Sequence, residues 1–288
     1  MNQRHRLPEP TKRIVRKEAF FGCVVCGNPI IEYAHIIPYG VSQDDSVDNL
    51  VALCPNHHTR YDLGGISKRK IRMFKSNPFN KERDVADRFD IEGDVPIIEA
   101  GTNIFKNTPV LLVIDNKNIV TLSKEEDELL LNAVFYDNND NLLAFIEDNE
   151  WCALSGMVWD IEYHTVAKAL VIRTKPRNIL LKLRISKGVV HFSGLLYYHG
   201  ISTRISPNKI MFGNNIMTWK RSTFENCITA FWFNTQKGSF GAGSSVHEHK
   251  YKKPICVTLM QRSNLLRGRI YETYYIMREC RFCGQIAI

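Results

Sequence analysis

The hydrophobic and polar positions of this chain follow one pattern in its first quarter and another in the rest. Apolar residues of the segment 11–20 recur at helical spacing, which predicts a short helix that begins near its threonine. The β-branched pair that opens the segment 30–35 predicts a strand, and 49–53 predicts a second one. The segment 55–64 begins with proline and ends with glycine, which suits a short helix.

In the last two thirds of the chain the pattern has a period of two. The segment 179–186 alternates apolar and polar side chains, which is typical of a half-buried strand. Two strand-like runs flank an Asn/Asp turn within 133–151, and several more follow. The segment 123–131 stays open between strand and helix, because Ser123 and Glu126 also have capping-box spacing.

These patterns predict an α+β protein with three parts. Residues 1–75 would form a small module with the order strand, loop, strand, short helix. Residues 76–100 read as a linker in which 81–89 suits a short helix, and residues 101–288 as a mostly β domain that targets or regulates the module.

Composition and charge narrow the class of protein. The 288 residues are 44% hydrophobic and 24% charged, as in soluble proteins that form a core. No apolar run is long enough to span a membrane and the N-terminus lacks the pattern of a signal peptide, so we expect a cytoplasmic location and no membrane partner. Lys and Arg outnumber Asp and Glu by 12 to 7 in residues 1–75 and by 19 to 4 in residues 173–288. Such basic flanks attract nucleic acid, although a solvated surface would look the same.

The cysteines suggest metal binding before disulfides, since the expected location is cytoplasmic. Cys23 and Cys26 have the two-residue gap of a zinc knuckle, and Cys54 with His57 repeats this gap. The four residues predict a closed structural zinc site, with buried thiols and a surface histidine as the alternative. Neighbouring side chains on a helix diverge by about 100°, so His58 would point away from this zinc.

The C-terminal segment offers a second knuckle. Cys280 and Cys283 have the same gap, but the candidate partners are irregularly spaced. A second zinc and free or buried thiols therefore both remain open; the partners would be His247, His249, Cys256 and Cys227.

Together the motifs of the first 70 residues resemble the HNH endonuclease family, whose catalytic unit has the ββα-metal fold. His35, Asn49 and His58 stand fourteen and nine residues apart, which fits the His, Asn, His signature of that family. The resemblance covers residues 10–70 and rests on CxxC at 23–26, AHIIP at 34–38, DNL at 48–50 and LCPNHH at 53–58.

The resemblance implies a role for each signature residue. His35 would be the general base, Asn49 would orient its imidazole, and His58 would bind a catalytic divalent ion such as Mg²⁺. A neutral imidazole can take the proton of an attacking water near neutral pH, and a divalent ion stabilises charge on the phosphate. The zinc, with four protein ligands, would be structural only.

Two positions depart from the family pattern. His57 stands where many members have a fourth cysteine, but zinc accepts either ligand. The other position is next to the first histidine. Many members have Asp directly before the first histidine, where this chain has Ala34. Glu32 shares a strand face with Ala34 and Asp62 follows His58 by one helical turn, so both are candidate ligands. Each could equally be a surface carboxylate or a group that supports a ligand.

We therefore expect a metal-dependent endonuclease that hydrolyses phosphodiester bonds in DNA rather than RNA, in restriction or anti-phage defence. Basic residues at 12–17 and 68–75 would contact phosphates, or form a solvated surface. Cleavage of both strands by a single site calls for two copies, so a homodimer is also expected. The alternative is a zinc-stabilised nucleic-acid-binding protein without catalysis, in which Ala34 marks a lost metal site.

Overall fold

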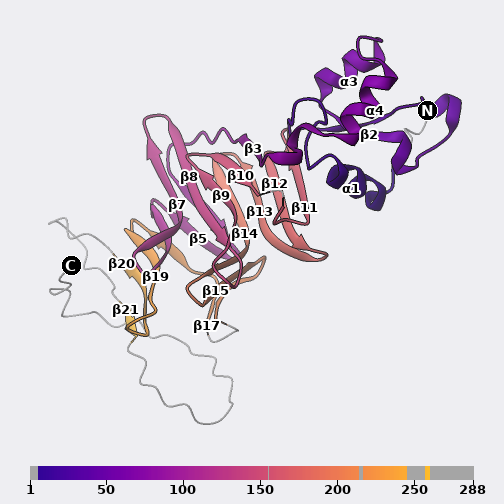
Figure 1. The fold of residues 1–288 in the computed structure, drawn as a ribbon. Helices are drawn as coiled ribbons and strands as arrows, with labels where there is room; N and C mark the ends of the chain where they lie inside the picture. Colours follow the sequence, from indigo (N-terminus) through magenta and orange to yellow (C-terminus); the bar gives the residue numbers. More distant parts are fainter. Residues whose placement is uncertain (1–5, 155, 214–216, 245–256, 260–288) are drawn as a thin grey trace. The chain divides into compact units, whose positions relative to one another are not determined.

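The computed structural model describes residues 6–154, 156–213, 217–244 and 257–259 (Figure 1). The chain forms two compact units, the first made of residues 1–90 with 142–186 and the second of 91–141 with 187–288. Helices and many strands occur in one chain, so the α+β class is confirmed. Each unit combines two separate segments of the chain. The division into a module at 1–75, a linker at 76–100 and a domain at 101–288 stays a prediction.

The N-terminal part of the first unit has the predicted order of strand, loop, strand and helix. Two further α-helices were not expected. The short helix 39–42 lies within the predicted loop, and the segment 68–76 is helical with Ser67 as its N-cap, whose Oγ accepts the N–H of Lys70. The elements are α1 (Glu9–Glu18), β1 (Glu32–His35), α2 (Tyr39–Ser42), η1 (Val47–Asn49), β2 (Leu50–Leu53), α3 (Pro55–Asp62), α4 (Lys68–Ser76) and η2 (Phe79–Glu82).

A small hydrophobic core holds these elements together. β1 and β2 pair antiparallel, with His35 opposite Leu50, and all four residues of β2 are buried. Figure 1 shows α1 on one side of β2 and α3 with α4 on the other. Val15 of α1 and Ile71 of α4 belong to the same buried cluster, which therefore fixes the helices against the hairpin.

The segment after α4 closes over the loop that carries Cys23 and Cys26. The N–H of Phe79 donates to the carbonyl of Val24 at 3.0 Å, and the Asn80 amide donates to the carbonyl of Gly27 at 3.0 Å. A Cβ on Gly27, whose φ is +78°, would lie 2.2 Å from the Asn80 side chain. This close approach requires glycine there.

The prediction of a helix at 81–89 is wrong. The chain forms only the short η2 there and then the strand β3 (Val85–Arg88), which pairs antiparallel with β10 (Glu150–Ala153). Pairing with a distant strand overrides a weak local preference for helix. The first unit also contains β9 (Leu142–Glu147), β11 (Asp160–His164), β12 (Ala169–Lys175) and β13 (Asn178–Ser186).

The second unit consists of strands around an aromatic core. The open segment 123–131 is a hairpin, because β7 and β8 pair antiparallel and Glu126 has a φ of 50° in the turn. Phe105, Phe212 and Phe231 are buried. The strands are β4 (Ile97–Ala100), β5 (Asn103–Lys106), β6 (Val110–Ile114), β7 (Lys117–Glu125), β8 (Glu128–Tyr136), β14 (Val189–Tyr198), β15 (Ile201–Ser206), β16 (Lys209–Phe212), β17 (Met217–Trp219), β18 (Thr223–Glu225), β19 (Thr229–Asn234), β20 (Ser239–Ser244) and β21 (Val257–Leu259).

Most strand pairs of this unit are antiparallel. β19 lies between β20, which is antiparallel to it, and β6, which is parallel. β14 pairs with β15 and also takes β4 as a parallel neighbour. Among the described residues, no helix has the length and apolar character needed to cross a membrane.

Candidate functional site

The two Cys/His pairs form one cluster at the start of α3. One donor atom from each of Cys23, Cys26, Cys54 and His57 lies within 4.8 Å of all the others. The Sγ atoms of Cys26 and Cys54 are 3.8 Å apart, and His57 Nδ1 is 3.2 Å from the Sγ of Cys54. Two thiolates bound tetrahedrally at about 2.3 Å to one zinc ion lie about 3.8 Å apart. The donor set and its spacing therefore fit a four-coordinate ion.

Burial disfavours the thiolate forms of the cysteines in this cluster. Burial raises the pKa of the Cys23 thiol to about 12 and also raises that of Cys26, because a thiolate is poorly stabilised away from water. Burial likewise lowers the pKa of His57, which favours the neutral ring that binds metals. A cation bound here would stabilise the thiolate forms of these cysteines.

The adjacent histidines of α3 face different partners, as predicted. The ring of His57 points to the cysteines, whereas Nδ1 of His58 lies 2.7 Å from Oε2 of Glu32 on β1. Nε2 of His58 lies 3.6 Å from Oδ2 of Asp62, one turn further along α3. The structure thus places both candidate carboxylates beside His58.

Ala34 contributes no donor to this group. Its side chain is buried in the core of the hairpin, while Glu32, two residues earlier on the same strand, is exposed and reaches His58. Carboxylate ligands suit Mg²⁺ or Mn²⁺, and an imidazole ligand also suits divalent transition ions such as Ni²⁺. The assignment of Glu32 and Asp62 as ligands stays a prediction.

His35 stands at the end of β1 and shares a cavity with His58. The cavity has a volume of about 550 Å³, and its lining includes Tyr33, Tyr61 and Asp62. Nε2 of His35 is 2.9 Å from Oδ1 of Asp45. The structure therefore brings the candidate base and the candidate metal ligand to one cavity, which is large enough to admit part of a substrate.

Asn49 is buried, and its amide bonds the backbone of the loop that follows β1. Its Oδ1 accepts the N–H of Ile37 at 2.8 Å, and its Nδ2 donates to the carbonyls of Ile37 and Asp44 at 3.0 and 2.9 Å. Because these bonds use both amide hydrogens, the amide does not itself donate to the His35 ring. The orienting role of Asn49 stays a prediction. The ring partner that sequence reasoning missed is Asp45, for which the only signal was the acidic pair at 44–45.

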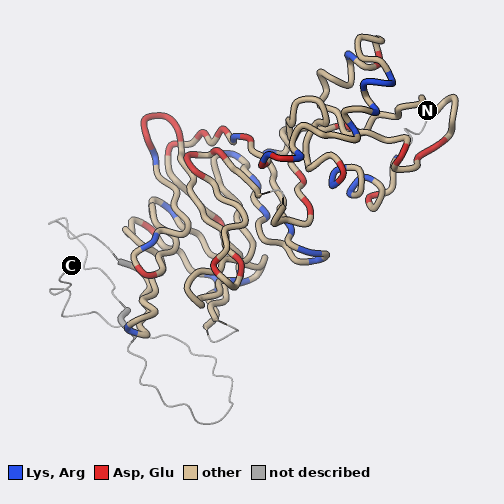
Figure 2. Tube along the Cα trace, viewed as in Figure 1, with Lys and Arg blue, Asp and Glu red and all other residues tan. Residues whose placement is uncertain are grey.

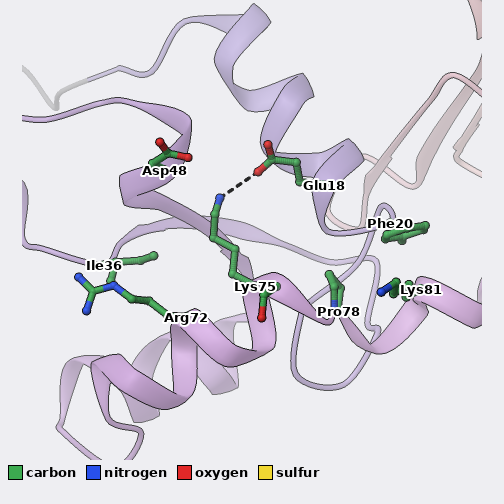
Figure 3. Close-up of a pocket in the computed structure, with 9 residues that line it drawn as sticks. Glu18, Phe20, Ile36, Asp48, Arg72, Lys75, Pro78 and Lys81 are labelled. Atoms are coloured by element: carbon green, nitrogen blue, oxygen red, sulfur yellow. Dashed lines mark hydrogen bonds and ion pairs between the residues drawn. The ribbon is translucent and has the colours of Figure 1, made fainter.

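A second hollow of the module contains several cations (Figure 3). Lys75 Nζ lies 2.9 Å from Oε2 of Glu18 and also donates to the carbonyls of Val47 and Leu50. Lys75 therefore anchors α4 to the hairpin, which corrects its expected role in phosphate contact. At the other end of α4, the residues at 68–70 are exposed, and Figure 2 shows basic residues along this helix.

Part of the basic segment 12–17 also forms contacts within the first unit. Arg16 is buried and pairs with Asp160 of β11 at 3.1 and 3.0 Å. Burial of the guanidinium lowers the pKa of Arg16, but its hydrogen bonds to Asp160 and Tyr33 raise that pKa by more, so the net shift is upward. The guanidinium of Arg13 lies 4.3 Å from the centre of the Trp159 ring. For Arg16 this corrects the expectation of phosphate contact.

The second candidate zinc knuckle falls mostly outside the described residues. Cys280, Cys283, His247, His249 and Cys256 lie outside the described residues. Cys227 is described, and its thiol donates to the carbonyl of Glu225 at 3.7 Å. The second zinc therefore stays a prediction.

Comparisons with known proteins agree with the site. Residues 23–67 match the family model described as HNH endonuclease. A type IV methyl-directed restriction enzyme of Escherichia coli (strain K12), EcoKMcrA, is 41% identical over 51 residues, which are 18% of this chain and 18% of that enzyme. No solved structure gives a significant match. The segment 23–67, which carries His35, Asn49 and His58, is thus an HNH endonuclease domain.

Proposed function

We propose that the chain is a divalent-metal-dependent endonuclease that hydrolyses phosphodiester bonds in DNA. The observation that supports this best is the shared cavity of His35 and His58, with Glu32 and Asp62 beside His58. Metal-assisted hydrolysis of a phosphodiester uses a general base and a bound divalent ion. His35 is the candidate base, and the carboxylates beside His58 are candidate ligands of the ion. The matching family supports the same reaction.

Each residue has a distinct task in this mechanism. His35 takes the proton of the attacking water as the general base. His58, with Glu32 and Asp62, would hold the ion, and a bound divalent ion stabilises the charge that develops on the phosphate and the leaving oxygen. Asn49 fixes the loop that follows β1 and so maintains the geometry around His35.

The Cys/His cluster would hold a structural zinc. Cys23, Cys26, Cys54 and His57 fill all four positions of a tetrahedral ion, which leaves none for a substrate. The ion would tie the loop before β1 to the start of α3. This link would keep His58 on α3 at a fixed place relative to β1.

We further propose DNA as the substrate and restriction or anti-phage defence as the role. The support is the similarity to a methyl-directed restriction enzyme, which covers only 18% of either chain. In this proposal the module at 1–75 cuts, and the β-rich domain at 101–288, joined through the linker 76–100, targets or regulates it. The protein would act in the cytoplasm, and as a homodimer to cut both strands.

Cleavage of supercoiled plasmid DNA in the presence of Mg²⁺, Mn²⁺ or Ni²⁺ tests the function. The wild type should nick or linearise the plasmid, and His35→Ala should lower the rate by roughly a hundredfold or more. His164→Ala is a matched control, because this histidine is exposed on β11 and does not line the cavity of His35. A wild type that never cuts with any of the three metals, or a His35→Ala variant that cuts normally, would overturn the proposal.

A second candidate function is nucleic-acid binding without catalysis. The observation in its favour is Ala34, a buried residue at a position where a ligand would be expected. DNA binding by the wild type at low salt, with no cleavage under any metal, is the result that would favour it.

A further inference from the structure

The loop between β1 and β2 has a fixed course because Asn49 bonds its backbone at two places. Asn49 bonds the N–H and carbonyl of Ile37 near the start of the loop and the carbonyl of Asp44 further along it. The backbone carbonyl of Asn49 also accepts the N–H of Ile36, the residue directly after His35, at 2.7 Å. Asn49 is only 5% exposed, so water cannot replace these bonds at low cost.

The two adjacent acids of this loop have different contacts. Asp44 Oδ1 accepts the N–H of Ser46 at 2.8 Å, a turn contact that shapes the loop. Asp45 Oδ1 instead lies 2.9 Å from Nε2 of His35, with side-chain exposures of 29% and 17% for the two residues. This pair is partly shielded from water, which strengthens a charge-assisted hydrogen bond.

The Asp45 contact determines which nitrogen of His35 can act as a base. An ionised carboxylate only accepts hydrogen bonds, so it selects the ring form with a proton on Nε2. In this form the lone pair is on Nδ1, which becomes the atom that takes the proton from water. Once His35 is protonated, the same carboxylate stabilises the imidazolium.

We propose that Asp45 is a positioning residue for His35, which fixes its tautomer and its orientation. Asn49 then acts on the base through the loop that carries Asp45. This inference rests on the proposed function, in which His35 is the base.

The experiment compares Asp45→Ala and Asp45→Asn with wild type in the full-length chain. Histidine rings labelled with ¹⁵N report the tautomer by NMR, and the missing signals of His35→Ala identify those of His35. We expect the Nε2–H form in wild type and a mixture of both forms in Asp45→Ala. Steady-state cleavage should show a kcat about 10- to 100-fold lower for Asp45→Ala with KM unchanged.

Asp45→Asn keeps the size of the side chain but removes its charge. Its amide can either accept from Nε2–H or donate to an unprotonated Nε2, so it no longer selects one tautomer. The stabilisation of the imidazolium is also lost, so kcat should fall. Asp48→Asn is the matched control, because Asp48 is exposed nearby in the sequence and does not line the cavity of His35. It should leave both kcat and the His35 spectrum unchanged.

Three results would overturn the inference: a wild-type ring in the Nδ1–H form, an Asp45→Ala ring that keeps the wild-type tautomer, or an Asp45→Asn variant with wild-type kcat. If Asp45→Ala fails to fold, the wild-type tautomer and the kcat of Asp45→Asn decide. If the wild type does not cut DNA, the proposed function fails, but the spectra still decide whether Asp45 sets the ring form.

Discussion

At the scale of residues, two adjacent histidines serve two separate groups. His57 Nδ1 lies 3.2 Å from the Sγ of Cys54, whereas His58 Nδ1 lies 2.7 Å from Glu32. A helix turns by about 100° per residue, so neighbouring side chains cannot enter the same site. The structural cluster and the proposed catalytic cluster therefore share α3 without sharing a ligand.

Substitution of each histidine should separate the two groups. His57→Ala should lose zinc and lower the melting temperature, because three cysteines cannot close the tetrahedral site. His58→Ala should keep both the zinc and the melting temperature, yet lose cleavage. Zinc analysis, thermal unfolding and plasmid cleavage on both variants check this. Equal loss of zinc from the two variants would contradict the division.

Glu32 is expected to supply the metal-binding carboxylate that Ala34 cannot provide. Because its carboxylate lies 2.7 Å from His58 Nδ1, Glu32→Gln should weaken binding of the catalytic ion. The Mg²⁺ or Mn²⁺ concentration for half-maximal cleavage should rise about 10- to 100-fold. Glu18→Gln is a matched control, since Glu18 pairs with Lys75 in the other hollow. An unchanged metal requirement in Glu32→Gln would exclude Glu32 from the metal site.

At the scale of elements, α4 presents an exposed basic end beside the candidate site. Lys68 lines the cavity of His35, and the next two residues are exposed cations. The far end of the same helix is anchored through Lys75 to Glu18 and to the hairpin (Figure 3). The helix is therefore anchored at its far end, and its exposed first turn can contact a phosphate.

Replacement of Lys68, Arg69 and Lys70 by Ala should lower cleavage about tenfold at moderate salt. Each lost phosphate contact should also reduce the slope of log affinity against log salt by about one. The triple exchange Lys68→Arg, Arg69→Lys and Lys70→Arg keeps the charge and should retain most of the activity. Cleavage by the alanine variant with wild-type rate and salt dependence would exclude phosphate contact by this turn.

The contact between α1 and β11 depends on a buried ion pair. Arg16→Ala would leave Asp160, which is only 2% exposed, without its main partner, so the free energy of unfolding should fall by about 3–5 kcal/mol. Arg13→Ala on the same helix removes only the contact with Trp159 and should cost about 1 kcal/mol. Urea unfolding of both variants measures this. Equal stability of the two variants would show that the pair contributes little.

The sequence predicted local elements better than distant contacts. The order of β1, β2 and α3 followed from periodicity and from Pro55 and Gly64, and the zinc cluster followed from ligand spacing. The pairing of β3 with β10 and the burial of Arg16 could not be predicted, because their partners lie more than 50 residues away. Asp45 was missed for a similar reason, since only the folded loop places it at His35.

At the scale of the whole molecule, the cysteine knuckle gives a test of metal content. The described residues contain one Cys/His cluster suited to a metal, so we expect one zinc per chain from it. Cys23→Ser with Cys26→Ser should remove that zinc and unfold the module. Metal analysis of the wild type and this variant checks it, and a zinc that remains in the variant would point to the Cys280 and Cys283 pair.

The central claim is that His35 performs catalysis and is not needed for binding DNA. It is tested most directly by measuring DNA affinity and plasmid cleavage on the same preparations of wild type and His35→Ala, with Mg²⁺ or Mn²⁺ present. We predict equal affinities and a cleavage rate at least about a hundredfold lower in the variant. Equal cleavage rates, or a wild type that binds DNA and never cuts it, would contradict the account.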